Sequence, residues 1–193
     1  MRLFLLGMGY SGGHIAALAR VHGFRVVGTT RDGRGDSIAF ADADRTRFEI
    51  GQATHILSSV PPGEAGDPVL DAHGAAIAAR AGGGAWVGYL SSTGVYGDTG
   101  GAWADESAPT GMGRRSARAA ADAAWRALPG ARVFRLPGIY GPGRSALDRV
   151  RAGTVVRVDA GAQLFSRVHV ADLAHGVLAG FAGPAGVFNL ADD

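Results

Sequence analysis

The sequence predicts an α/β fold with a doubly wound parallel sheet, that is, a sheet covered by helices on both faces. Short apolar runs alternate with helix-like segments along most of the chain, as expected when a helix connects each strand to the next. The apolar runs are nearly continuous and do not alternate with polar residues, which is typical of strands buried on both faces. The length of 193 residues suits one domain with a single core.

The first strand, helix and second strand are expected within residues 2–29. Residues 2–6 form an apolar run that ends at a glycine, and residues 12–21 read as a helix. Residues 24–29 are rich in the β-branched residues that favour strands. These three elements make one βαβ unit, the building block of a parallel sheet.

Later elements continue the alternation, with one irregularity. Strands are expected at 46–50, 55–60, 85–91 and 132–136. Helices are expected at 67–81 and, after a glycine-rich loop at 97–113, from 113 to about 128. Only residues 51–54 separate the third strand from the fourth, and four residues are too few for a parallel crossover. Either a helix has been lost from this connection or residues are missing from it.

The region from residue 141 onward is less regular. A helix is expected at 145–152, a strand near 155–158 and a second helix at 170–181. We expect this region to cap the strand ends and to form one wall of a substrate cleft on the same core.

Composition excludes several classes of protein. The formal net charge is +2, and all 19 basic side chains are arginines scattered along the chain, so we expect no nucleic-acid partner. The chain has no cysteine, and its six histidines lack the short spacings of metal ligands, so no metal site is expected. Without a long apolar run or a signal peptide, the sequence predicts a cytoplasmic protein that has no membrane partner.

A glycine motif directly follows the first predicted strand. Gly7, Gly9 and Gly12 match the pattern G-x-G-x-x-G, with Tyr10 and Ser11 between the last two glycines. In a Rossmann fold the first glycine permits a tight turn, the second lets the backbone approach a pyrophosphate, and the third lets helix and strand pack closely. The helix that follows points unpaired N–H groups at the phosphates. The motif therefore predicts a dinucleotide site at these five residues, the alternative being an ordinary strand-to-helix turn.

The end of the second strand indicates which dinucleotide is bound. A site that prefers NAD would carry Asp or Glu there to hold the ribose 2′-hydroxyl, whereas this strand ends in Thr30 and Arg31. A guanidinium group pairs well with a 2′-phosphate, and the threonine adds a hydroxyl, so NADP is favoured over NAD. Asp32 could compete for Arg31, and the alternative is that Arg31 is a solvated surface residue.

A second motif, SSTGVYG at 91–97, follows the strand expected at 85–91, at the sheet edge where this fold binds ligands. With four other segments in the same order, it resembles the extended short-chain dehydrogenases/reductases, the NAD-dependent epimerase/dehydratase family. The other segments are the glycine motif, RLPGIYGPGR at 135–144, VHVAD at 168–172 and FNL at 188–190. The resemblance covers nearly the whole chain. It implies a nicotinamide dinucleotide cofactor, a small-molecule substrate, a Rossmann domain at 1–140 and part of a substrate cleft at 141–193.

The resemblance also assigns site residues. The residue at Ser92 holds the reacting oxygen in this family, with Thr93 beside it; the alternative is that Ser92 only caps the strand end. Cofactor contacts are expected from Ser58, Val60, Pro61, Ser91, Arg118 and Pro137. The alternative for residues 58–62 is an ordinary strand end before prolines. Substrate contacts are expected from Tyr96, Arg114, Tyr140, Arg144, Arg167 and His169.

The chain departs from the family at the catalytic Tyr-x-x-x-Lys pair. When Asp122 is aligned with the usual acidic residue, Arg114 takes the tyrosine position and Arg118 the lysine position. Arginine cannot exchange a proton near neutral pH. Arg118 could instead hold ribose or phosphate, and Arg114 could bind an acidic group of the substrate or belong to a solvated helix face.

Two functions are compatible with these observations. The first is an NADP-dependent oxidoreductase or epimerase that acts on a small polar substrate, either sugar-like or acidic. The second is a non-catalytic NADP-binding module that senses the redox state of the cofactor. A homodimer is compatible with both. Relatives of this kind usually continue beyond the region that ends at Asp193, so the substrate cleft is expected to be incomplete in this chain.

Overall fold

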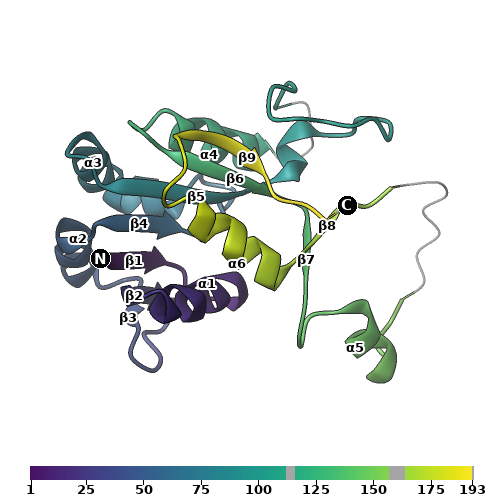
Figure 1. Cartoon of the computed structure of the whole chain (residues 1–193), viewed down its shortest axis with the longest axis horizontal. Helices are drawn as coiled ribbons and strands as arrows, with labels where there is room; N and C mark the ends of the chain where they lie inside the picture. Colours follow the sequence, from purple (N-terminus) through teal and green to yellow (C-terminus); the bar gives the residue numbers. More distant parts are fainter. Residues whose placement is uncertain (112–115, 157–163, 193) are drawn as a thin grey trace.

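The computed structural model describes residues 1–111, 116–156 and 164–192, and these residues form a seven-stranded, entirely parallel sheet (Figure 1). The strand order is β3-β2-β1-β4-β5-β6-β9, so the direction of winding reverses between β1 and β4. The strands are β1 (Arg2–Leu6), β2 (Arg25–Thr30), β3 (Ile38–Ala39), β4 (His55–Ser58), β5 (Trp86–Ser92), β6 (Arg132–Leu136) and β9 (Gly186–Asn189). The predicted doubly wound α/β fold is confirmed.

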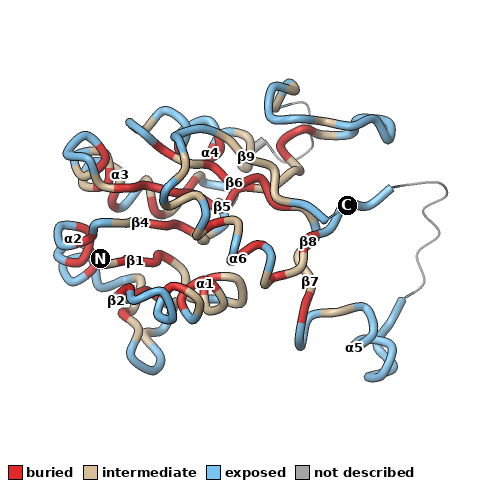
Figure 2. The backbone as a smooth tube through the Cα atoms, viewed as in Figure 1, coloured by how far each residue is buried: buried red, intermediate tan, exposed pale blue. Residues whose placement is uncertain are grey.

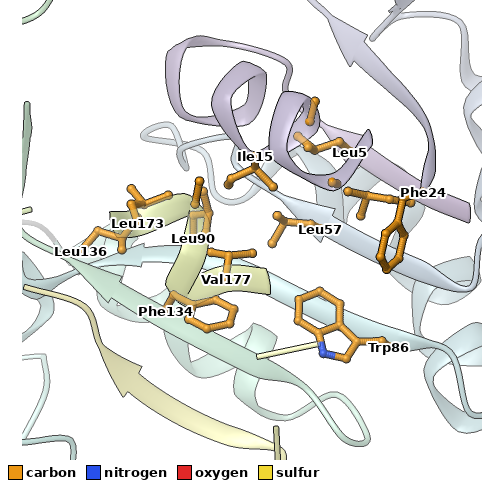
Figure 3. Close-up of a cluster of buried hydrophobic side chains, with 14 of the residues drawn as sticks. Leu5, Ile15, Phe24, Leu57, Trp86, Leu90, Phe134, Leu136, Leu173 and Val177 are labelled. Atoms are coloured by element: carbon orange, nitrogen blue, oxygen red, sulfur yellow. The ribbon is translucent and has the colours of Figure 1, made fainter. Parts of the chain in front are cut away.

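Helices cover both faces of the sheet. The covering helices are α1 (Tyr10–Val21) and α6 (Val170–Ala179) on one face, and α2 (Ala43–Gln52), α3 (Pro68–Gly82) and α4 (Ser116–Arg126) on the other. Two further elements are the 3₁₀ turn η1 (Thr93–Tyr96) after β5 and helix α5 (Ala146–Arg151). One apolar cluster lies between the sheet and α1 with α6, and includes Leu57, Trp86 and Val177 (Figure 3). A second cluster lies on the other face, against α2, α3 and α4. The central strands between these layers are buried along most of their length (Figure 2).

The strand predicted at 46–50 is wrong, because these residues belong to α2. Thr46, Phe48 and Ile50 alternate with polar residues as in a strand, but Thr46, Glu49 and Ile50 are the buried ones, at helical spacing. The carboxylate of Asp42 accepts a hydrogen bond from the backbone N–H of Arg45 and caps the helix start. The apparently missing crossover is therefore α2 itself. It follows β3, a two-residue strand too short to be recognised in the sequence.

The C-terminal region also contains strands that sequence patterns did not predict. Strands β7 (Gly138–Tyr140) and β8 (Arg167–His169) form a separate parallel pair, and β9 joins the main sheet beside β6. Residues 155 and 156 are not in a strand, so that part of the strand expected at 155–158 is wrong; residues 157 and 158 lie outside the described residues. Helix α4 is described from residue 116, and residues 113–115 of the helix expected there lie outside the described residues.

Helix α5 extends away from the sheet at the end of β7 and is exposed to solvent, with no buried residue (Figures 1 and 2). Its start is well defined, since Ser145 and Asp148 form a reciprocal capping box. Within the described ranges, every helix is too short or too polar to span a bilayer.

Candidate functional site

The glycine motif forms a tight turn between β1 and α1. Gly7 has a φ of +95°, and a Cβ at this position would lie 2.8 Å from the Ser59 hydroxyl oxygen. A Cβ at Gly12 would lie 2.3 Å from the carbonyl oxygen of Gly7, so only glycine lets the helix approach the strand here. A Cβ at Gly9, by contrast, would meet no protein atom within 4 Å. The space beside Gly9 is therefore open to a ligand.

Neighbouring strands hold this turn in place. The backbone N–H of Gly7 donates to the Thr29 hydroxyl (3.0 Å), and the N–H of Met8 donates to the Thr29 carbonyl oxygen (2.7 Å). Directly after β4, the hydroxyl of Ser59 donates to the carbonyl oxygen of Gly7. Gly9 is the N-terminal cap of α1, and no side chain of the described residues accepts a hydrogen bond there. The free N–H groups of the first turn fit a pyrophosphate, as the sequence predicts.

The loop after β2 holds itself in a compact shape. The Thr30 hydroxyl is 2.6 Å from that of Ser37 and accepts a hydrogen bond from the N–H of Arg34 (3.2 Å). Thr30 therefore shapes the loop, and its expected contact with the phosphate stays a prediction. Arg31 is exposed, without an ion pair to any described carboxylate within 4.0 Å. The carboxylate of Asp32 is stabilised by backbone hydrogen bonds and by Thr30, which lower its pKa.

Ser92 and Thr93 lie where β5 passes into η1, at the carboxyl end of the sheet. The Ser92 hydroxyl oxygen accepts a hydrogen bond from the N–H of Gly94 (3.1 Å) and caps the turn. This contact uses a lone pair and leaves the hydroxyl hydrogen to donate. The capping role considered for Ser92 is thus present, and it orients the hydroxyl. Both side chains are half-buried.

Ser91 points to the opposite face of β5 and belongs to a buried polar network. Its hydroxyl donates to a carboxylate oxygen of Asp122 (2.6 Å), and the same carboxylate receives two hydrogen bonds from Arg135 (2.9 and 3.1 Å). Arg135 also donates to the Tyr96 hydroxyl (2.9 Å), which in turn donates to Asn189 (2.7 Å). Burial by itself lowers the pKa of Arg135, but the bonds to Asp122 and Tyr96 outweigh it and the pKa is raised.

This network engages the hydroxyls of two residues expected to contact ligands. Ser91 was expected to contact the cofactor and Tyr96 the substrate, but their hydroxyls are already bonded inside the core. The reason is the two-residue period of a strand, which turns Ser91 toward α4 when Ser92 faces the other way. Sequence reasoning missed Arg135 and Asn189, although a buried arginine with a carboxylate partner could have been suspected from Asp122.

The remaining expected cofactor residues are spread around the glycine turn and α4. Ser58 is fully buried, and its hydroxyl has no partner among the described residues. Val60 packs against Gly7, Pro61 is exposed, and Pro137 is half-buried between β6 and β7. Arg118 lies on the first turn of α4 near Tyr89; burial raises the pKa of Tyr89, and the charge of Arg118 opposes the rise. Arg114 lies outside the described residues.

Three of the expected substrate residues line one pocket. A cavity of about 470 Å³ opens between β7, β8 and α5, and Tyr140, Arg144 and Arg167 form part of its wall. Arg149 on α5 also lines it, a residue that sequence reasoning did not single out. Interaction with the carboxylate of Asp192 raises the pKa of Tyr140. Because the lining carries three guanidinium groups and one carboxylate, that of Asp148, the pocket suits an anionic ligand.

His169 is not among the residues that line this pocket, but it packs against Tyr140, which is. It caps α6, accepting a hydrogen bond at Nδ1 from the N–H of Ala171 (3.3 Å), and its ring packs against Tyr140 at 5.2 Å between ring centres. The backbone N–H of His169 donates to the carboxylate of Asp192 (3.1 Å). The structure thus places His169 next to the expected substrate residues and gives it a capping role that sequence patterns did not predict.

Comparison with known proteins identifies relatives by structure. No family model and no curated protein matches the sequence. The fold matches that of a UDP-glucose 4-epimerase from Thermus thermophilus in complex with NAD, at 18% identity and a TM-score of 0.75, over 99% of this chain and 78% of that one. It also matches a human epimerase family protein with NADPH, at 20% identity and a TM-score of 0.75, over 99% and 74%. At these identities the likeness shows a shared fold.

A more similar relative is a functionally unknown conserved protein from Silicibacter pomeroyi. It is 37% identical, with a TM-score of 0.84, and the match covers all of this chain and 72% of that one. The chain therefore belongs to the same family as this Silicibacter pomeroyi protein, and its fold is that of the NAD-dependent epimerases and dehydratases.

Proposed function

We propose that this protein is an NADP-dependent oxidoreductase or epimerase that acts on a small polar substrate carrying an anionic group. The observation that carries the proposal is the common location of three features at the carboxyl end of one parallel sheet. These are the open glycine turn at Gly9, the oriented hydroxyl of Ser92 and the arginine-lined cavity beside β7. Doubly wound folds bind their ligands at this edge.

The glycine turn and the loop after β2 would hold the cofactor. The pyrophosphate fits the space beside Gly9, where the N–H groups of the first turn of α1 face it. Arg31 and Arg34 stand on the loop after β2, and a guanidinium group there favours the 2′-phosphate of NADP. When bound, the nicotinamide would accept or donate a hydride.

Ser92 would donate its hydroxyl hydrogen to the reacting oxygen of the substrate. Its oxygen is fixed by the N–H of Gly94, so the donor is oriented before the substrate binds. The family's Tyr-x-x-x-Lys pair is absent from the sequence. The guanidinium group of Arg118 would hold ribose or phosphate in place of the family's lysine. Catalysis would therefore depend on hydrogen bonding and positioning, without a titrating pair.

The contacts and burial of the four tyrosine side chains favour a second candidate function. This is a non-catalytic module that senses the redox state of NADP. The hydroxyls of Tyr10 and Tyr96 donate hydrogen bonds to Pro142 and Asn189. Interaction with Asp192 raises the pKa of Tyr140, and Tyr89 is buried. In this arrangement none of the four tyrosine hydroxyls is available to replace that of the missing catalytic tyrosine. A protein with these properties would bind the cofactor without turning it over.

Calorimetric titration tests the cofactor site. The protein should bind NADPH at least about tenfold more tightly than NADH, because one charge-assisted contact to the 2′-phosphate contributes roughly 1.5–3 kcal/mol. Arg31→Ala should remove most of this preference. Gly9→Val should abolish binding of both nucleotides, since its side chain would occupy the space left for the pyrophosphate.

Gly13→Val is the matched control for Gly9→Val. A Cβ at Gly13 also meets no protein atom within 4 Å, but this residue lies one turn into α1. Gly13→Val should keep its affinity for NADPH. Equal affinities of the parent for NADPH and NADH would contradict the assignment of Arg31, and unchanged binding by Gly9→Val would contradict the site.

Turnover distinguishes the enzyme from the sensor. NADPH consumption should be screened against sugars, aldehydes and keto acids, and any active substrate then compared in the parent and Ser92→Ala. Loss of a donor to the developing oxyanion should lower kcat by roughly 10²-fold. Full activity of Ser92→Ala would contradict the role of this residue, and a parent that binds NADPH but is inactive across the panel would favour the sensor.

A further inference from the structure

Tyr10 connects the cofactor turn to the substrate pocket. It is the first residue of α1, directly after Gly9, yet its side chain lies against a loop more than 130 residues further along the chain. Its hydroxyl donates to the carbonyl oxygen of Pro142 (3.1 Å). The guanidinium carbon of Arg144 lies 5.3 Å from the centre of its ring, within the range of a cation–π contact.

The loop from Gly141 to Arg144 is held closely against this side chain. Gly141 and Arg144 close the loop with two backbone hydrogen bonds, of 2.9 and 3.3 Å. Gly141 has a φ of +154°, and a Cβ there would lie 2.7 Å from the Tyr10 hydroxyl and 2.7 Å from a methyl carbon of Val170. The loop backbone therefore fits into a space bounded by α1 and α6. Contact with Tyr10 therefore helps to position the loop backbone from which the Arg144 side chain extends.

Arg144 can still offer hydrogen bonds from this position. It lines the 470 Å³ cavity with Arg149 and Arg167, and within the described ranges no carboxylate lies within 4.0 Å of its guanidinium nitrogens. The nearest acidic residue on α5, Asp148, is engaged with Ser145 and Arg151. Contact with a ring face leaves the N–H edge of a guanidinium group available to an anion.

We propose that Tyr10 is a positioning residue for anion binding, which holds Arg144 in place to bind the anionic group of the substrate. The proposal rests on the proposed function for the anionic nature of the substrate. Its test measures binding of phosphate and does not require turnover. The sequence predicts that Tyr10 contacts the cofactor. The proposal gives it another role, because its side chain contacts the loop from Gly141 to Arg144. The residue acts through Arg144 and does not touch the ligand itself.

A double-mutant cycle on the full chain, with inorganic phosphate as probe, tests the proposal. Phosphate affinity is measured calorimetrically in the parent, Tyr10→Leu, Arg144→Ala and the double variant, each with saturating NADPH so that the glycine turn is filled. Tyr10→Leu should weaken binding by about tenfold, a change within the range for loss of a cation–π contact. The double variant should bind no more weakly than Arg144→Ala, because Tyr10 acts only through that side chain.

Tyr10→Phe provides the conservative comparison, since it keeps the ring under Arg144 and should stay within about threefold of the parent. If circular dichroism shows Tyr10→Leu to be unfolded, Tyr10→Met replaces it in the same cycle. Normal phosphate binding by the leucine variant, or additive losses in the double variant, would overturn the proposal. So would a loss of NADPH affinity in Tyr10→Leu with phosphate binding intact.

The proposal and the proposed function fail separately. The loss of phosphate affinity in Arg144→Ala defines the signal from this pocket, so phosphate bound at an empty glycine turn is recognised because Arg144→Ala does not change it. A parent that does not bind NADPH would contradict the proposed function and leave the cycle interpretable.

Discussion

The imidazole of His55, at the start of β4, is packed among aromatic rings. The ring centres of Phe24, Trp86 and Phe181 lie 5.1, 5.8 and 4.8 Å away. Burial disfavours the protonated ring, and the positive charges of the N-terminus and Arg132 add to this effect, so the pKa of His55 falls from 6.5 to about 4. The folded protein therefore keeps this histidine neutral in mildly acidic solution.

The pKa of His55 predicts a pH-dependent stability. Between pH 6.5 and about 4 the unfolded chain binds a proton at His55 that the folded protein excludes. The free energy of unfolding should therefore fall as the pH falls through this window. His55→Phe should make that dependence shallower by up to one proton, as measured by urea unfolding at a series of pH values.

Two other histidines serve as comparisons in this experiment. The pKa of His73 is also lowered by burial, so some pH dependence should remain in His55→Phe. His22 is exposed at the end of α1, and His22→Gln should leave the profile of the parent unchanged. If the free energy of unfolding of His55→Phe depended on pH as steeply as that of the parent, His55 would not be an origin of this dependence.

The network around Asp122 and Arg135 joins five elements. Asp122 lies on α4 and Arg135 on β6, with Ser91 on β5, Tyr96 on η1 and Asn189 on β9. Both partners of the ion pair are essentially without solvent exposure, at 1% or less. The network attaches the turn that carries Ser92 and the helix that carries Arg118 to the centre of the sheet.

Removal of one partner of this pair should be costly, because it leaves the other charge buried and unpaired. Asp122→Leu should lower the free energy of unfolding by about 3–5 kcal/mol. The double variant Asp122→Leu with Arg135→Met should recover most of that loss. Urea unfolding of both variants provides the measurement.

An exposed ion pair provides the matched control. Asp44 and Arg47 lie 3.5 Å apart on α2, and the Asp44 side chain is 98% exposed. Asp44→Leu should cost less than about 1 kcal/mol. If the double variant at Asp122 and Arg135 were no more stable than Asp122→Leu alone, an uncompensated charge would not be the cause.

Helix α2 shows how a sequence pattern can favour the wrong element. Over residues 46–50 an alternating pattern and a helical pattern coincide, and five residues are too few to separate them. The cap at Asp42 and the burial of Ile50 against the sheet decide in favour of a helix. Longer segments with one clear period, such as β5 and α3, were predicted within two residues of their observed bounds.

The parallel sheet brings together motifs that are far apart in the sequence. Because all seven strands point the same way, the loops after β1, β2, β5 and β6 all emerge at one edge (Figure 1). Helix α6 packs against α1 on one face, and β9 adds the seventh strand beside β6. The C-terminal region thus completes the core that the N-terminal region begins. Its loop from Gly141 to Arg144 meets the glycine turn through Tyr10.

Local sequence patterns were sufficient to predict the doubly wound fold, the tight glycine turn between β1 and α1, and the location of Ser92 at the end of a strand. A tight turn, an apolar strand and a helix start each depend on a few adjacent residues, so their signals can be read directly. The partners of polar side chains depend instead on distant segments. The bonds of Ser91 to Asp122 and of Tyr96 to Asn189 span 31 and 93 residues, and no local pattern reveals them. The short strands β3, β7 and β8 likewise exist only because neighbouring strands supply their hydrogen bonds.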